Sequence, residues 1–171
     1  DELKGNSFKS EECIIIPDLD RKLKKVLAVE KPNKEALKVL FIDVTLFFSD
    51  ETNMLYNVFE PPLGQMSILT YLKNKLKDNV DGKIIKSRVD FDNFDELKKI
   101  IDEFKPDVIG VRALSYYKHF FHRTIAKIRS WGINVPIVVG GPYVTSTWQS
   151  VLQDFNIDVA ILGEGEITFT E

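Results

Sequence analysis

The chain is poor in cysteine and histidine. Its 171 residues include one cysteine, Cys13, and two histidines, His119 and His122. A single cysteine cannot form a disulfide within the chain, which is typical of the reducing cytoplasm, where we expect this protein. It also excludes an iron–sulfur cluster or zinc site whose cysteine ligands all come from this chain. Because Cys13 precedes an apolar run, we expect it to be buried rather than reactive.

Long apolar runs and an excess of positive charge are absent as well. The 23 basic and 26 acidic residues give a net charge of -3, so the sequence lacks a nucleic-acid footprint. The short basic cluster Arg21–Lys25 is interpreted as a solvated helix face. No apolar run approaches the roughly 20 residues of a membrane span, and the start has no signal-peptide core. We therefore expect neither a nucleic acid nor a membrane as partner.

The length fits one well-cored domain with an extension. Residues 1–36 are charged and irregular, with a possible short helix over Leu19–Val29, and are interpreted as an N-terminal extension or cap. Residues 37–171 have a regular pattern and are expected to form the domain itself. Because a helix is expected to begin at Ile167, close to Glu171, the sequence indicates a part of a longer protein.

The domain alternates strands with helices, which predicts a parallel sheet with right-handed crossovers. Short β-branched runs give five predicted strands: Leu37–Ile42, Lys83–Val89 near an edge, Val108–Ala113, Val135–Val139 and Asp158–Leu162. The helices between them show core stripes at helical spacing: Met66, Leu69, Leu72 and Leu76; Phe94, Leu97, Ile101 and Phe104; Tyr117, Phe121, Thr124, Ile128 and Trp131. A fourth, short helix is expected over Ser146–Phe155. The fold class is therefore α/β: a flavodoxin-like (Rossmann-like) five-stranded parallel sheet with helices on both faces.

The predicted strand ends indicate where a ligand binds, because open α/β sheets bind ligands at the carboxyl ends of their strands. Glycines follow two of these strands, at Gly140–Gly141 and at Gly163 and Gly165. Glycine lets the backbone turn sharply or lets a flat ligand approach. The site is not a phosphate-binding glycine loop, since no such loop follows the first strand. It is not a phosphoacceptor site of the receiver type either, because the third strand ends in Arg112 without an aspartate.

Four motifs at these places resemble a known family. Pro61–Gly64, Pro106–Gly110, Val138–Pro142 and Leu162–Glu166, in this order, are similar to the cobalamin (vitamin B12)-binding domain of radical S-adenosylmethionine (radical SAM) enzymes. The resemblance runs from about Leu37 to Glu171. It implies a domain N-terminal to a radical SAM barrel of the same polypeptide. That barrel carries a three-cysteine 4Fe-4S site and binds S-adenosylmethionine, and it would lie beyond Glu171.

The resemblance also implies a function and a set of binding residues. The whole protein would be a cobalamin-dependent enzyme, a methyltransferase or a catalyst of another radical reaction, and this domain alone would have no turnover. Gly140, Gly141 and Pro142 would let the corrin or its nucleotide tail approach the fourth strand. Gly163, Glu164 and Gly165 would form the neighbouring loop. The segment Arg112, Ala113, Leu114 and Ser115 would line the pocket for the dimethylbenzimidazole tail.

The segment after the first strand departs from the family pattern. Classical cobalamin domains carry Asp-x-His-x-x-Gly there, with the histidine as lower cobalt ligand, whereas this chain has Asp43 and Thr45 without a histidine. This predicts base-off cobalamin without a protein ligand to cobalt, so no residue is assigned as a metal ligand. Arg112 replaces the serine of the classical Ser-x-Leu motif. It would either bridge a tail phosphate or propionamide or close the pocket. The aromatic loop from Thr45 to Glu60 either covers a corrin face or forms a hydrophobic cap.

Other interpretations of these residues remain open. The glycine pair at Gly140–Gly141 would equally suit a tight turn. Glu164 and Glu166 suit a helix N-terminus better than acid–base catalysis, and no catalytic residue is assigned. His119 and His122 are expected to be solvated, since no third metal ligand is in view. Two rival functions follow: a degenerate docking module, whose pocket is filled by Arg112, Leu114 and the aromatic loop, or a flavin- or nucleotide-binding domain.

Overall fold

The computed structural model describes residues 32–51 and 59–171. Cys13, the predicted helix Leu19–Val29 and Tyr56 lie outside these ranges. Five parallel strands form one sheet in the order β2-β1-β3-β4-β5, which confirms the predicted flavodoxin-like fold and the edge position of the second strand. The strands are β1 (Leu37–Asp43), β2 (Val80–Lys86), β3 (Val108–Arg112), β4 (Ile137–Gly140) and β5 (Val159–Ala160).

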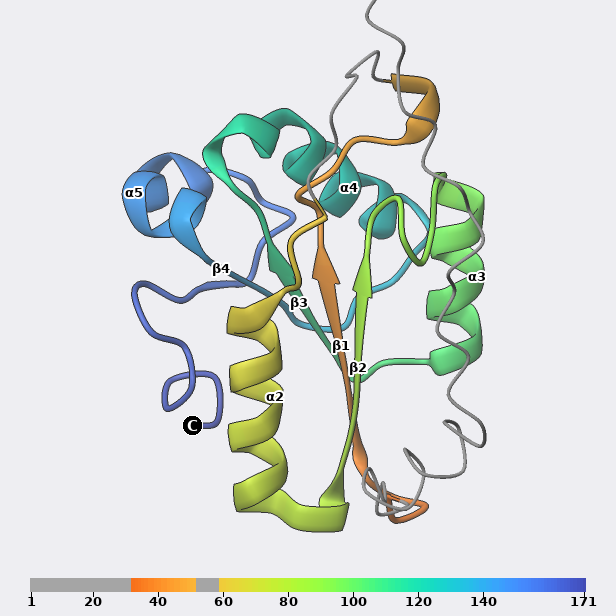
Figure 1. The fold of residues 1–171 in the computed structure, drawn as a ribbon, viewed down its shortest axis with the longest axis vertical. Coiled ribbons are helices and arrows are strands. Elements are labelled where there is room, and N and C mark those ends of the chain that lie inside the picture. Colours follow the sequence, from red (N-terminus) through yellow and green to blue (C-terminus); the bar gives the residue numbers. More distant parts are fainter. Residues whose placement is uncertain (1–31, 52–58) are drawn as a thin grey trace, which may run out of the picture. The chain divides into compact units, whose positions relative to one another are not determined.

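Helices cover both faces of the sheet, as predicted (Figure 1). On one face, α3 (Phe94–Phe104), α4 (Lys118–Ser130) and α5 (Pro142–Val151) bury the main core against Leu40, Ile42, Ile109 and Ile137. The other face carries α2 (Leu63–Leu76), which packs on Val39 and Phe41. The C-terminal segment lies on this second face, where Phe169 joins the same cluster. The α2 face is therefore covered by a single helix and the C-terminal segment.

Local residues determine where α3 and α5 begin. The predicted start of α5 was wrong. The Asn93 side chain caps α3 by accepting a hydrogen bond of 2.9 Å from the backbone amide of Glu96. The helix predicted to begin at Ser146 begins four residues earlier, at Pro142. Gly141 has a φ of 94°, which turns the chain sharply, and proline is well suited to the first helical position.

The second strand and its following segment also differ from the prediction. The structure places β2 at Val80–Lys86 rather than Lys83–Val89. Arg88 has a φ of 64°, so the chain bends where the strand was expected to continue, and Val89 is exposed. The predicted start of a helix at Ile167–Glu171 is a set of turns, in which the Phe169 amide donates to the carbonyl of Gly165.

The predicted core stripe of α2 is confirmed at its last three positions but not at its first. Met66, expected in the core, is 46% exposed, whereas Gln65 is only 3% exposed. Gln65 lies three residues before Ile68 and seven before Leu72, so it occupies the first position of the face that packs on the sheet. A polar residue therefore occupies a position that the apolar pattern could not mark. None of the helices in the described ranges is long and apolar enough to cross a bilayer.

Candidate cofactor site

A row of charged residues crosses the sheet at the carboxyl ends of its strands. In the strand register Asp43 of β1 is level with Lys86 of β2 and with Arg112 of β3, and Arg112 is level with Gly140 of β4. Side chains alternate between faces along a strand. Asp43 therefore shares the face of Val39 and Phe41, which is the α2 face. The row places an acid between two bases, with a glycine at its end.

Asp43 is completely buried and its charge is compensated from both sides. Its carboxylate lies 2.7 Å from Arg112 Nη1 and 3.4 Å from Lys86 Nζ. It also accepts a hydrogen bond of 3.0 Å from the backbone amide of Thr45, whose hydroxyl contacts Lys86 Nζ. A buried charge is tolerated only when it is paired and hydrogen-bonded in this way. The arrangement fixes the direction of the Arg112 side chain.

One level deeper in the sheet, the same face is apolar. Phe41, Gly110 and Val138 are neighbours in the register of β1, β3 and β4. A Cβ atom at Gly110 would lie 2.5 Å from Cδ1 of Phe41, so glycine makes room for the aromatic ring. The ring of Phe41 packs at 5.0 Å on that of Phe169 from the C-terminal segment. These residues form an apolar floor below the charged row.

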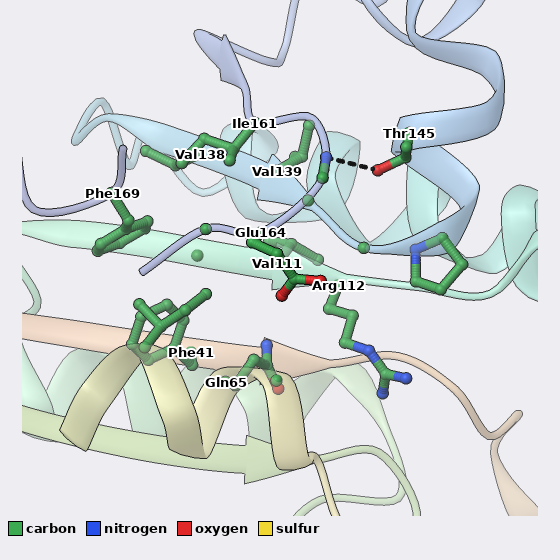
Figure 2. Close-up of a pocket in the computed structure, with 18 of the residues that line it drawn as sticks. Phe41, Gln65, Val111, Arg112, Val138, Val139, Thr145, Ile161, Glu164 and Phe169 are labelled. Carbon is green, nitrogen blue, oxygen red and sulfur yellow. Dashed lines mark hydrogen bonds between the residues drawn. The ribbon is translucent and has the colours of Figure 1, made fainter. Parts of the chain in front are cut away.

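A cavity of about 490 Å³ lies above this floor. Figure 2 shows Phe41 and Gln65 on its α2 side, with Glu164 on the loop that faces them. Three groups of residues line it: the α2 wall, the sheet, and the loops after β4 and β5 together with the first turns of α5. They are Gly64, Gln65 and Ile68; Phe41, Gly110, Val111, Arg112, Val138, Val139 and Gly140; Gly141, Pro142, Thr145, Ser146, Ile161, Gly163, Glu164, Gly165, Glu166 and Phe169.

The loop after β5, which contains Gly163, Gly165 and Glu166, makes short contacts with α2 and α5. Gly165 is buried, and a Cβ atom there would lie 2.9 Å from Cδ1 of Ile68 on α2. The Ser67 hydroxyl donates a 2.6 Å hydrogen bond to Glu166, which lowers the pKa of that carboxyl below its ordinary value. On the other side, the Gly163 amide donates to Thr145 Oγ1 at 3.1 Å (Figure 2). The loop therefore closes the cavity between α2 and α5.

The structure brings together seven of the residues proposed from the sequence and separates five others from the cavity. Those that line it are Arg112, Gly140, Gly141, Pro142, Gly163, Glu164 and Gly165. Ala113 is buried in the core of the opposite face, and Leu114 and Ser115 lead into the turn before α4. Asp43 and Thr45 act behind the lining through their bonds to Arg112 and Lys86.

Two polar residues of this site were not found from the sequence. Lys86 was placed inside a strand of weak alternation, and Gln65 inside a helix whose core stripe started at Met66. Both are buried, at 5% and 3% exposure. The sequence carried no signal for Lys86, because its place opposite Asp43 follows from the pairing of β2 with β1. For Gln65 the usable signal was the spacing of three residues to Ile68.

The structure bears on one of the two possibilities for Arg112, the one in which its side chain closes the pocket. Its guanidinium points away from Phe41 (Figure 2) and binds Asp43, while its Cγ lies where a Cβ on Gly141 would make a 2.9 Å contact. The side chain thus forms one edge of the cavity without closing it. Leu114 does not line the cavity. The filled pocket expected of a degenerate domain is not what the described residues form.

The described part of the aromatic loop packs mainly on the α3 and α4 side. Phe48 is buried and meets Phe94 and Phe120 edge-to-face, at 5.0 and 4.9 Å. Phe47 contacts Tyr117, whose pKa is raised by burial and, to a smaller degree, by the nearby Tyr116, Glu60 and Asp43. These contacts favour the interpretation of this segment as a hydrophobic cap.

The two histidines lie on α4, on the face of the sheet opposite the cavity. His119 is exposed, as predicted. His122 is half-buried and paired rather than freely solvated, because its Nδ1 lies 2.6 Å from Asp154 and its Nε2 lies 3.0 Å from the Tyr143 hydroxyl. The prediction for His122 was wrong since the early start of α5 brings Tyr143 beside α4. Within residues 32–51 and 59–171, no three His, Cys, Asp or Glu side chains are grouped to hold a metal ion.

Fold and cavity together define an open α/β domain with a cavity at its topological switch point. The strand order reverses between β1 and β3, and the cavity spans β1, β3 and β4 at that place. Residues 57–171 match the B12 binding domain family, and the chain belongs to that family.

Two known proteins are similar to this chain. It is 32% identical over 152 residues to an uncharacterized methyltransferase of Pyrococcus horikoshii, and the match covers 88% of this chain. The chain spans 29% of that protein's length. Among solved structures, the N-terminal domain of the nisin resistance regulator NsrR, a lantibiotic response regulator, matches with a TM-score of 0.46 and 17% identity. That match covers 78% of this chain and 90% of the regulator domain.

Proposed function

We propose that this chain binds cobalamin, with the nucleotide tail in the cavity between α2 and the sheet and the corrin at the carboxyl edge of the strands. The observation that carries the proposal is the cavity itself, which lies at the switch point of a B12 binding domain and reaches the charged row at Arg112 and Gly140. Its volume of about 490 Å³ falls within the roughly 300–1,000 Å³ typical of small-ligand sites.

The residues that line the cavity fit the parts of this cofactor. The apolar floor of Phe41, Gly110 and Val138 suits a flat aromatic base, because it offers ring and aliphatic surface without polar atoms that need partners. Arg112 and Gly140 at the rim suit the polar linker and the corrin amides. Gly140 leaves the backbone accessible, since a Cβ atom there would come no closer than 3.7 Å to another residue.

The cofactor is proposed to bind base-off and without a protein ligand to cobalt. Both histidines of the chain are on α4, behind the sheet, and His122 is held by Asp154 and Tyr143. The position of the classical histidine is occupied by the segment after Asp43, where Thr45 is fixed by Lys86. A tail held in the cavity could not reach back to cobalt, so the lower face of the corrin would meet the edge of the sheet.

The larger protein is proposed to be a cobalamin-dependent radical SAM methyltransferase. This chain spans 29% of the length of a relative that is named a methyltransferase, which leaves room for a catalytic part. That part would carry the 4Fe-4S cluster and bind S-adenosylmethionine. Cobalamin would supply cobalt-centred methyl transfer, while the residues described here hold the tail and orient the corrin.

A visible spectrum recorded during titration with hydroxocobalamin tests the binding mode. We expect the spectrum to change from the base-on to the base-off form on binding, and this base-off spectrum to be retained in the double variant His119→Gln, His122→Gln. A bound cofactor that keeps its base-on spectrum would contradict a tail in the cavity. A base-off spectrum that changes in the double variant would contradict ligand-free cobalt.

A further inference from the structure

Gln65 carries a polar atom without a partner in the wall of the cavity. The side chain is 3% exposed and its Nε2 donates a 3.1 Å hydrogen bond to the carbonyl of Ile42. Its other polar atom, Oε1, is buried and accepts no hydrogen bond. In the described ranges this situation is shared only by Nη1 of Arg88, which does not line the cavity.

The orientation of the Gln65 amide is determined by Ile42. Turning the amide over would direct Oε1 at another carbonyl oxygen, so the nitrogen faces Ile42 and the oxygen remains the free acceptor. A buried acceptor without a donor costs about 1–3 kcal/mol. An apolar residue would avoid this cost at a position that packs on the sheet. The glutamine therefore fits a site in which a ligand supplies the missing donor.

The height of Gln65 in the cavity indicates which part of a ligand it meets. Its partner Ile42 is level with Val111, between the floor residues Phe41 and Gly110 and the charged pair of Asp43 and Arg112. Figure 2 shows Gln65 beside Phe41, on the α2 side of the cavity. A ring lying on the floor would have its linker at this level, between the apolar floor and the rim.

We propose that Gln65 is a specificity-determining residue whose Oε1 accepts a hydrogen bond from a sugar hydroxyl of the nucleotide tail. This rests on the proposed function, in which the tail occupies the cavity. The hydroxyl would satisfy the orphan acceptor at the level where the base joins the phosphate linker. Gln65 would then recognise the tail and make no contact with the corrin ring.

The experiment compares cobalamin with cobinamide, which has the corrin but lacks the base, sugar and phosphate of the tail. Gln65→Met keeps the length of the side chain and removes the acceptor. We expect it to weaken cobalamin binding about 5- to 10-fold, the value of one hydrogen bond, and to leave cobinamide binding unchanged. Thr70→Ala, at an exposed position of the same helix, is the matched control and should change neither.

Three other outcomes overturn the proposal. Unchanged cobalamin binding by Gln65→Met would mean that Oε1 meets water. An equal loss for both ligands would place the contact on the corrin. A wild-type chain that binds no cobalamin would remove the proposed function as well, which distinguishes the two failures. Urea unfolding of each variant verifies its fold, and Gln65→Leu replaces Gln65→Met if the latter does not fold.

Discussion

Asp43 shows how single residues prepare this edge of the sheet. A carboxylate with no exposed surface is stable here because β2 and β3 each end in a base at its level, Lys86 and Arg112. The same pairing keeps the Arg112 guanidinium out of the cavity. The charged row therefore stabilises the fold and shapes the site at once.

Removing the charge of Asp43 should destabilise the protein. In Asp43→Asn two largely buried cations lose their counter-charge, and we expect a loss of about 3 kcal/mol in the free energy of unfolding. Urea denaturation measures it. The control is Glu103→Gln, which breaks an exposed pair with Lys99 at 4.0 Å and should cost no more than about 0.5 kcal/mol. Equal effects of the two variants would show that the row is not a structural element.

The contact of His122 with Asp154 predicts that the stability of the fold decreases at acid pH. Burial by itself raises the pKa of Asp154, but hydrogen bonds from His122 and Asn156 outweigh it, and the pKa lies below its ordinary value. A carboxyl with a lowered pKa stabilises the fold above its unfolded pKa of about 4, and this stabilisation is lost as the pH falls through the folded value.

Asp154→Asn tests this dependence. At neutral pH we expect the variant to be less stable than the wild type by about 1 kcal/mol, and the difference to shrink at pH values below about 4. Urea unfolding followed by tryptophan fluorescence at the two pH values measures it. A difference that stays constant with pH would contradict the lowered pKa.

Lys86 and Gln65, which were not found from the sequence, are buried because of their positions in the strand pairing and on the inner face of α2. Lys86 is opposite Asp43 only when β2 begins at Val80, three residues before the predicted start. Gln65 faces the sheet because α2 turns that position inward together with Ile68 and Leu72. Hydrophobic periodicity cannot mark a polar residue as buried, so side chains of this kind are found only once the pairing is known.

At the scale of elements, strands were predicted from the sequence more accurately than the start of α5. The strands predicted at Leu37–Ile42, Val108–Ala113 and Val135–Val139 coincide within two residues with β1, β3 and β4, because their composition and length suit buried parallel strands. The start of α5 was missed because Gly140, Gly141 and Pro142 read as a loop. The conformation of one glycine decides it, and a positive φ cannot be recognised from composition.

Replacement by alanine should therefore change stability differently at the neighbouring glycines Gly140 and Gly141. Gly141 has a φ of 94° and its Cβ would lie 2.9 Å from Cγ of Arg112, so Gly141→Ala should cost about 2 kcal/mol. Gly140 has neither constraint, and Gly140→Ala should change stability by at most about 0.5 kcal/mol. Thermal and urea unfolding of both variants measure this. Similar losses in both would mean that a tight turn alone explains the pair.

At the scale of the whole molecule, one face of the sheet holds the main core and the other holds the cavity. The face with α3, α4 and α5 holds the main core, including the aromatic residues Phe48, Phe120 and Phe121. The face with α2 leaves a cavity at the switch point of the sheet. The sequence predicted this architecture and the glycine-lined edge. The depth of the cavity depends on Gly110 and Gln65, which become significant only through their contacts with Phe41 and Ile42.

Calorimetric titration of the wild type and of Gly140→Val with cobalamin tests the central claim most directly. Valine suits a strand, and at Gly140 it would project from the charged row into the mouth of the cavity. We expect the wild type to bind one cobalamin per chain and Gly140→Val to bind none, while both unfold at the same urea concentration. Equal binding by the two folded proteins would contradict the account, because cobalamin would then bind elsewhere.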